Sequence, residues 1–177
     1  MTEMVSELRY EVSAKTAKVT VTARPITVAP GVCFTMKADY PDKGGKLDGD
    51  DLQFNSGEGA FELTFKLDDD DTGLNLAFYP DFVDAMWVAV GQTCPKIAGD
   101  GNGAITAKSV ADKKLVVMNA NAVSQTLTFA LRFTGNASPL GNPPYVYDPR
   151  IINGGGGFVE EDGGDDEEED RRREQGE

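Results

Sequence analysis

The chain of 177 residues contains no histidine, only two cysteines and a single tryptophan. The absence of histidine excludes Ser-His-Asp and Cys-His catalysis, histidine-bound zinc or copper, and acid–base chemistry by imidazole. Cys33 and Cys94 are too few for a structural zinc site of their own, and they predict two free thiols rather than a disulfide. We therefore expect a protein that is not an enzyme and that has no resident cofactor.

Basic residues are also scarce, with 17 lysines and arginines against 30 aspartates and glutamates. The resulting net charge of −13 argues against binding to nucleic acid or to an anionic membrane surface, since both need a basic patch. No apolar run approaches the roughly 20 residues of a membrane-spanning helix. The first residues, MTEMVSELRYEV, lack the basic start and apolar centre of a secretory signal. The sequence predicts a cytoplasmic protein with neither nucleic acid nor membrane as partner.

Alternation of apolar and polar residues is the main pattern that is present. It is clearest in AKVTVTAR (17–24), AFELTFKL (60–67) and QTLTFALRF (125–133), and it is typical of half-buried antiparallel strands. Shorter strands are predicted at 8–12, 32–38, 74–79, 86–90, 104–108 and 115–118, and one helical turn at 80–85. Turns rich in Gly, Asp and Pro separate them. The pattern predicts an all-β fold, a single antiparallel β-sandwich that is immunoglobulin-like in architecture.

The most apolar stretch, DFVDAMWVAV (81–90), includes Met86 and Trp87. It predicts a central strand with Trp87 in the core. The alternative is an exposed Met-Trp pair that anchors a partner protein.

Composition changes abruptly after Asn153. Residues 154–157 are four glycines, and residues 160–177 contain 11 acidic residues and three arginines. Such a segment cannot bury enough apolar surface to offset the entropy lost on ordering it. We predict one β-sandwich domain over 1–153, followed by a glycine hinge and a disordered acidic tail over 154–177.

The last stretch before the hinge is YVYDPRIIN, residues 145–153. Its alternation predicts a short final strand, and Asp148–Pro149 predicts a turn that locks it, because proline fixes φ and aspartate accepts bonds from the following amides. Ile151 and Ile152 supply apolar anchors. Alternatively the segment is an interaction site formed by Asp148, Pro149, Ile151 and Asn153.

The pattern of these four residues is similar to the ending of a group of small bacterial β-sandwich proteins, which finish in D-P-x-I-x-N after a strand. The likeness takes in the long strand at 125–133 and so covers about the last third of the domain. It implies a compact all-β module. Some of those proteins are named "nucleotide synthetase", but this chain contains no GxxxxGK[ST] phosphate loop that could support such an activity.

Two groups of aspartates are candidate metal ligands: Asp48, Asp50 and Asp51 in one loop, and Asp68, Asp69, Asp70 and Asp71 in another. Hard cations such as Ca²⁺ take carboxylate oxygens, and loops at one end of a sandwich can bring two groups together. A cation would also relieve the repulsion between adjacent aspartates. The alternative is that these loops are acidic for solubility alone.

Three functions remain open. The first is a non-enzymatic module that binds a protein partner or assembles with itself through its sheet edges. The second is an acidic polyanion that competes for basic surfaces as a nucleic-acid mimic would. Its acidic run includes Glu160, Glu161, Asp165, Asp166, Glu167, Glu168, Glu169 and Asp170. The third is a weak calcium-binding module built on the aspartate loops.

Overall fold

The structure is a computed structural model that describes residues 13–26, 31–136 and 145–155. The described chain is all-β apart from one four-residue helix. In chain order its elements are β1 (Lys15–Pro25), β2 (Val32–Asp39), β3 (Gly45–Asp48), β4 (Asp51–Asn55), β5 (Phe61–Asp68), β6 (Ala77–Phe78), α1 (Phe82–Ala85), β7 (Met86–Val90), β8 (Ile105–Ala111), β9 (Lys114–Asn119), β10 (Gln125–Thr134), β11 (Tyr145–Tyr147) and β12 (Arg150–Gly155).

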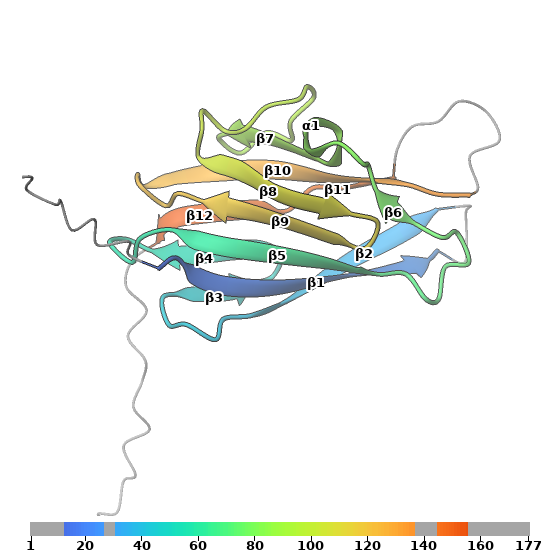
Figure 1. Ribbon diagram of the computed structural model, residues 1–177, viewed down its shortest axis with the longest axis horizontal. Helices are drawn as coiled ribbons and strands as arrows, with labels where there is room; N and C mark the ends of the chain where they lie inside the picture. Colours follow the sequence, from blue (N-terminus) through green and yellow to red (C-terminus); the bar gives the residue numbers. More distant parts are fainter. Residues whose placement is uncertain (1–12, 27–30, 137–144, 156–177) are drawn as a thin grey trace, which may run out of the picture.

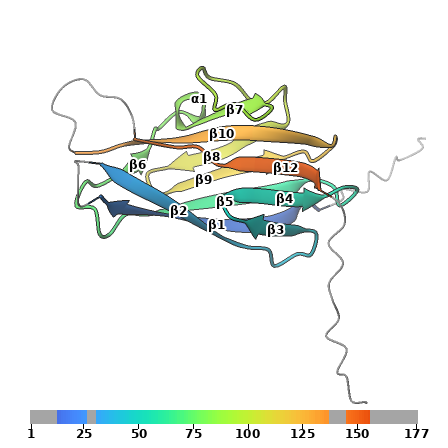
Figure 2. The same ribbon diagram turned by 180° about the vertical axis from the view of Figure 1, so that it is seen from behind.

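These strands form two sheets that pack face to face. The first has the order β2-β1-β5-β9-β8, and the second has the order β11-β10-β12-β4-β3, with β6 and β7 also paired to β10. Figure 1 shows the first sheet in front, and Figure 2 shows the second. The core lies between them, where Phe65 packs on Phe129 and Phe54 on Phe61, with ring centroids 5.6 and 4.6 Å apart.

The alternating stretches form strands as predicted. The stretches at 17–24, 60–67 and 125–133 lie in β1, β5 and β10, and each places its apolar residues in the core. The stretch at 86–90 matches β7, and the helical turn at 80–85 contains α1. No helix in the described part of the chain is long and apolar enough to cross a membrane.

Two strand pairs are parallel, so the expectation of a purely antiparallel arrangement is incorrect. β1 pairs with β5, and β4 with β12, in parallel. The first case follows from the chain path. After β1 and β2 the chain crosses to the second sheet for β3 and β4, then returns to lay β5 against the free side of β1 in the same direction (Figure 1). Alternation does not encode strand direction, so the sequence alone does not reveal these crossings.

The segment after Asp148–Pro149 corrects a second prediction, because the chain does not turn there. β11 and β12 both run antiparallel to β10 in one continuous register: Tyr147 faces Leu131, and three residues later Arg150 faces Thr128. The proline interrupts a strand rather than ending it, since it has no N–H to donate. β12 then lies inside the sheet, between β10 and β4.

Trp87 is not in the core. Met86 and Val88 point inward and are buried, whereas Trp87 lies on the outer face of the second sheet and is half-buried. The guanidinium of Arg132 covers its ring at 3.9 Å from the centroid, and the indole N–H donates to the carbonyl of Val83 at 2.9 Å. Strand alternation therefore places Met86, not Trp87, in the core.

Some predictions fall outside the described residues. These are the strand at 8–12 and the acidic tail, including Glu160, Glu161, Asp165, Asp166, Glu167, Glu168, Glu169 and Asp170. Within the described part, β12 continues to Gly155, two residues past the predicted end of the domain at Asn153.

Candidate functional site

The second half of the D-P-x-I-x-N segment belongs to the core. Ile151 is fully buried, and Asn153 forms a reciprocal pair with Asn119 of β9 in the opposite sheet. Asn119 Nδ2 donates to Asn153 Oδ1 at 2.8 Å, and Asn153 Nδ2 donates to Asn119 Oδ1 at 3.1 Å. Each buried amide thus satisfies the other. Ile151 and Asn153 are therefore structural residues that join the two sheets.

A third asparagine extends this connection to a neighbouring loop. The backbone N–H of Asn121 donates to Asn119 Oδ1, and Asn121 Nδ2 donates to the carbonyls of Asn55 and Gly59. Asn121 adopts a positive φ of 45°, a conformation that asparagine tolerates better than most residues. These bonds fix the connection between β4 and β5 against the end of β9.

The first half of the segment lies beside the first group of aspartates, with Asp148 exposed and Pro149 buried. β3 and β4 form a hairpin whose turn contains Gly49, with φ of +60°, and Asp50. Because Asp51 pairs with Arg150, this turn lies next to Asp148–Pro149. A pocket of about 480 Å³ opens here, lined by Asp48, Gly49, Asp50, Asp51, Gln92, Cys94, Thr128, Asp148, Pro149 and Arg150. We call it the acidic pocket.

Three contacts hold the hairpin to the neighbouring strands. The Tyr147 hydroxyl donates to Asp50 Oδ1 at 2.7 Å, and Arg150 forms a two-point ion pair with Asp51, at 2.7 and 2.5 Å. Burial, together with the hydrogen bond to Asp50, raises the pKa of Tyr147 above its ordinary value. The bond to Asp51 likewise raises the pKa of Arg150. At neutral pH the tyrosine is a donor and the arginine a cation.

Cys94 reaches the acidic pocket from the loop after β7. Burial raises the pKa of its thiol to about 11, and the adjacent carboxylate of Asp148 contributes further to the rise. A thiol with such a pKa is protonated near neutral pH and is a poor nucleophile. Cys33, on β2, is exposed, and both cysteines are free thiols as predicted.

The second group of aspartates lies elsewhere and has a different role. Asp69 is buried, accepts a hydrogen bond from the backbone N–H of Leu76 at 2.5 Å, and forms an ion pair with Lys113. It thereby closes the loop between β5 and β6. Asp68, Asp70 and Asp71 are exposed. The first group of aspartates thus contacts the segment that contains β11 and β12, whereas Asp69 of the second group contacts Leu76 and Lys113.

In the described part of the chain, no three carboxylates or thiols are arranged to hold a metal ion. Asp50, Asp51 and Asp69 are instead engaged by Tyr147, Arg150 and Lys113. Calcium binding by either group stays a prediction.

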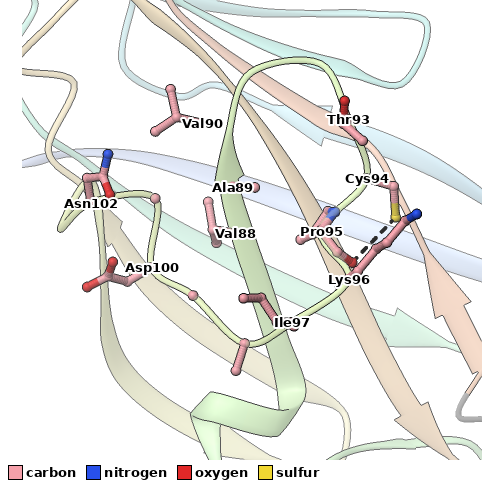
Figure 3. Close-up of a pocket in the computed structure, with 13 residues that line it drawn as sticks. Val88, Ala89, Val90, Thr93, Cys94, Pro95, Lys96, Ile97, Asp100 and Asn102 are labelled. Carbon is pink, nitrogen blue, oxygen red and sulfur yellow. Dashed lines mark hydrogen bonds between the residues drawn. The ribbon is translucent and has the colours of Figure 1, made fainter.

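A second pocket, of about 490 Å³, lies beside the acidic pocket and shares Cys94 with it. Figure 3 shows the loop of residues 91–102 passing around β7, with Val88, Ala89 and Val90 on the strand and Pro95 and Ile97 on the loop. Ile97 is 78% exposed and Val90 is 48% exposed. This pocket is more apolar than the acidic pocket.

Sequence reasoning found the aspartates of the acidic pocket but missed the residues that bind them. The sequence predicts Tyr147 and Arg150 only as parts of the last strand and its following turn, predicts Cys94 only as a free thiol, and indicates no role for Gln92. A charge-complementary pair such as Asp51 and Arg150 is a signal in principle. It becomes visible only once β4 and β12, which are 99 residues apart at this pair, are known to be neighbours.

Comparison with known proteins gives little further information. No family model and no curated protein matches the chain. Among solved structures the chain is similar to an inclusion body protein, PixA, from Burkholderia cenocepacia, at 8% sequence identity and a TM-score of 0.36. That likeness covers 82% of this chain and 99% of the other. At this identity and TM-score it assigns neither a family nor a function to this chain.

Proposed function

We propose that the protein is a non-enzymatic interaction module, immunoglobulin-like in architecture, and that it binds a basic surface of a protein partner at the acidic pocket. The observation that carries the proposal is the convergence of four aspartates from two distant segments around one open pocket. Asp48, Asp50 and Asp51 come from the β3–β4 hairpin, and Asp148 from the break between β11 and β12. Among the described residues that line this pocket, Arg150 is the one cation against four aspartates, so this lining carries a net negative charge.

The acidic tail supports the same choice of partner. Its composition gives it the same sign of charge as the pocket, so a basic surface would be attracted to both. The tail and the pocket then act together: the tail increases the rate of encounter, and the pocket provides a defined contact. The polyanion hypothesis becomes a part of this proposal rather than a rival to it.

A pull-down from an extract of the source cells, with the whole chain immobilised as bait, tests the proposal. We expect basic proteins to be retained at about 50 mM salt and released at about 500 mM, because charge attraction is screened. A chain ending at Gly155 should retain the same partners more weakly. The double variant Asp48→Asn, Asp148→Asn should retain them least among chains of full length.

Capture that is unchanged in the double variant would place the partner elsewhere on the molecule. Capture that survives high salt would contradict a charge-based contact. Calcium at millimolar concentration serves as a separate arm: a rise in melting temperature would support the calcium alternative.

A further inference from the structure

β11 is an end strand of the second sheet. The backbone hydrogen bonds of the two residues that follow Asp148 show which of the strand's peptide groups face away from β10. The carbonyl of Pro149 accepts from the N–H of Phe129, so residue 149 faces β10. The N–H of Arg150 donates to the carbonyl of Asp50 at 3.4 Å, so residue 150 faces away from β10, toward the hairpin. Peptide groups alternate in direction along a strand. Val146 and Asp148 therefore face away from β10 as well.

The outward peptide groups of Val146 and Asp148 have no backbone partner within the described part of the chain. Among the strands of the described residues, none covers them at this point, because β4 begins only at Asp51, opposite Arg150. Val146 is 41% exposed and Asp148 is exposed too. β11 thus presents a short open edge that leads into the acidic pocket, which Asp148 lines.

Three other edges, those of β7, β8 and β2, are less available to an added strand. The loop at 99–101 bonds to Val88 and covers the outer side of β7. A bulge between Ala107 and Ser109 disrupts β8, and bulges of this kind discourage pairing at an edge. β2 is a longer end strand, but its exposed side chains include both Lys37 and Asp39, which gives no preference for charge.

We propose that an extended segment rich in lysine or arginine adds to the second sheet as a strand along β11. Its backbone would pair with the outward groups of Val146 and Asp148. Its basic side chains would contact Asp48, Asp50 and Asp148 around the acidic pocket. Main-chain bonds supply affinity in this mode of recognition, and the side chains supply selectivity. The inference rests on the proposed function and specifies the form of the partner.

The experiment uses a capped peptide of about seven residues that alternates lysine and valine, a length typical of a strand. Its control has glutamate in place of every lysine. Binding to the full chain is measured by calorimetry, and protection of individual amides by hydrogen exchange. We expect the lysine peptide to bind and the glutamate peptide not to bind. Binding should slow exchange at the N–H groups of Val146 and Asp148.

Two variants separate backbone pairing from charge attraction. Val146→Pro removes one outward N–H, and it leaves the pairing with β10 intact because that N–H does not face β10. Val146→Thr is the matched control, since it keeps the N–H and suits a strand. We expect the proline variant to lose about tenfold in affinity, and the threonine variant to stay within about twofold.

Equal affinity in the proline and threonine variants would overturn strand addition, as would binding without protection of Val146. If the proline variant still captures basic proteins from the extract at the wild-type level, strand addition is wrong while the proposed function stands. If Asp48→Asn, Asp148→Asn leaves both capture and peptide affinity unchanged, the proposed function fails too.

Discussion

The two halves of one six-residue segment differ sharply in their surroundings. Asp148 and Pro149 both line the acidic pocket and Asp148 is exposed, whereas Ile151 and Asn153 lie in the core between the sheets. The change occurs over a few residues because β12 enters the interior of the second sheet just after the proline. A motif that appears as one unit in the sequence therefore spans two environments. Asp148 is exposed beside the acidic pocket, and the second half of the motif joins the two sheets.

The largest expected effect comes from removing β12. A chain that ends at Asp148 loses the strand that links β10 to β4, together with Ile151 and the Asn119–Asn153 pair. We expect no cooperative thermal unfolding for this chain. A chain that ends at Gly155 keeps β12, and its melting temperature should stay within a few degrees of the full chain. Calorimetry on both chains checks this, and a fall of more than about 10 °C for the longer one would show that the tail packs on the domain.

A smaller but clear effect is expected at the buried amide pair. Asn153→Ala leaves the amide of Asn119 buried without its partner, which should lower the free energy of unfolding by about 1–3 kcal/mol. Asn119→Ala should lower the free energy of unfolding by a similar amount, because it leaves the amide of Asn153 buried without its partner. Denaturant unfolding of the single and double variants measures the coupling between them. A double variant that equals the sum of the singles would show that the two amides do not act as a pair.

Asp148 and Pro149 should contribute less to the stability of the fold than the buried amide pair does. Since the chain runs straight on at this point, neither residue locks a turn. We expect Asp148→Asn, at an exposed position, to change the free energy of unfolding by less than about 0.5 kcal/mol. Pro149 is buried, and Pro149→Ala should lower the free energy of unfolding by about 0.4–1 kcal/mol, because the unfolded chain gains freedom. Asp148→Asn should nonetheless weaken binding of a basic partner, measured by the same calorimetry as the lysine peptide. A large loss of stability in either variant would instead support the prediction that Asp148–Pro149 locks the last strand.

The smallest effect concerns the reactivity of Cys94. Its raised pKa of about 11 keeps the thiol protonated at pH 8, so alkylation should be slow there and accelerate only as the pH approaches 11. The exposed thiol of Cys33 is the internal reference. Asp148→Asn removes a carboxylate that raises this pKa, so it should lower the pKa and speed alkylation of Cys94. Peptide mass spectrometry after timed iodoacetamide treatment distinguishes the two cysteines.

Much of the fold could be predicted because strand alternation is a local signal. Strict alternation predicts strands such as β1 and β10 to within a few residues. It does not predict β3, β4 and β12, because Asp48–Asp51 and Asp148–Pro149 resemble loops. Apart from the β3–β4 hairpin, the pairing partners of these strands also lie far away in the sequence. The acidic pocket was only half predicted for the same reason. Its aspartates are visible in the sequence, but Tyr147 and Arg150 acquire their roles only through the parallel pairing of β4 with β12.

The place of β12 also bears on how the protein reaches its native state. Asp51 and Arg150 pair across 99 residues, so the second sheet is incomplete until a late part of the chain has been synthesised. Until then β10 and β4 each have an unfilled side, and such unpaired edges are prone to aggregation in nascent chains. Long-range parallel pairing also slows folding, because the entropy of closing a large loop is lost before the contacts form. We expect refolding in milliseconds to seconds, with insertion of β12 as the step that limits its rate.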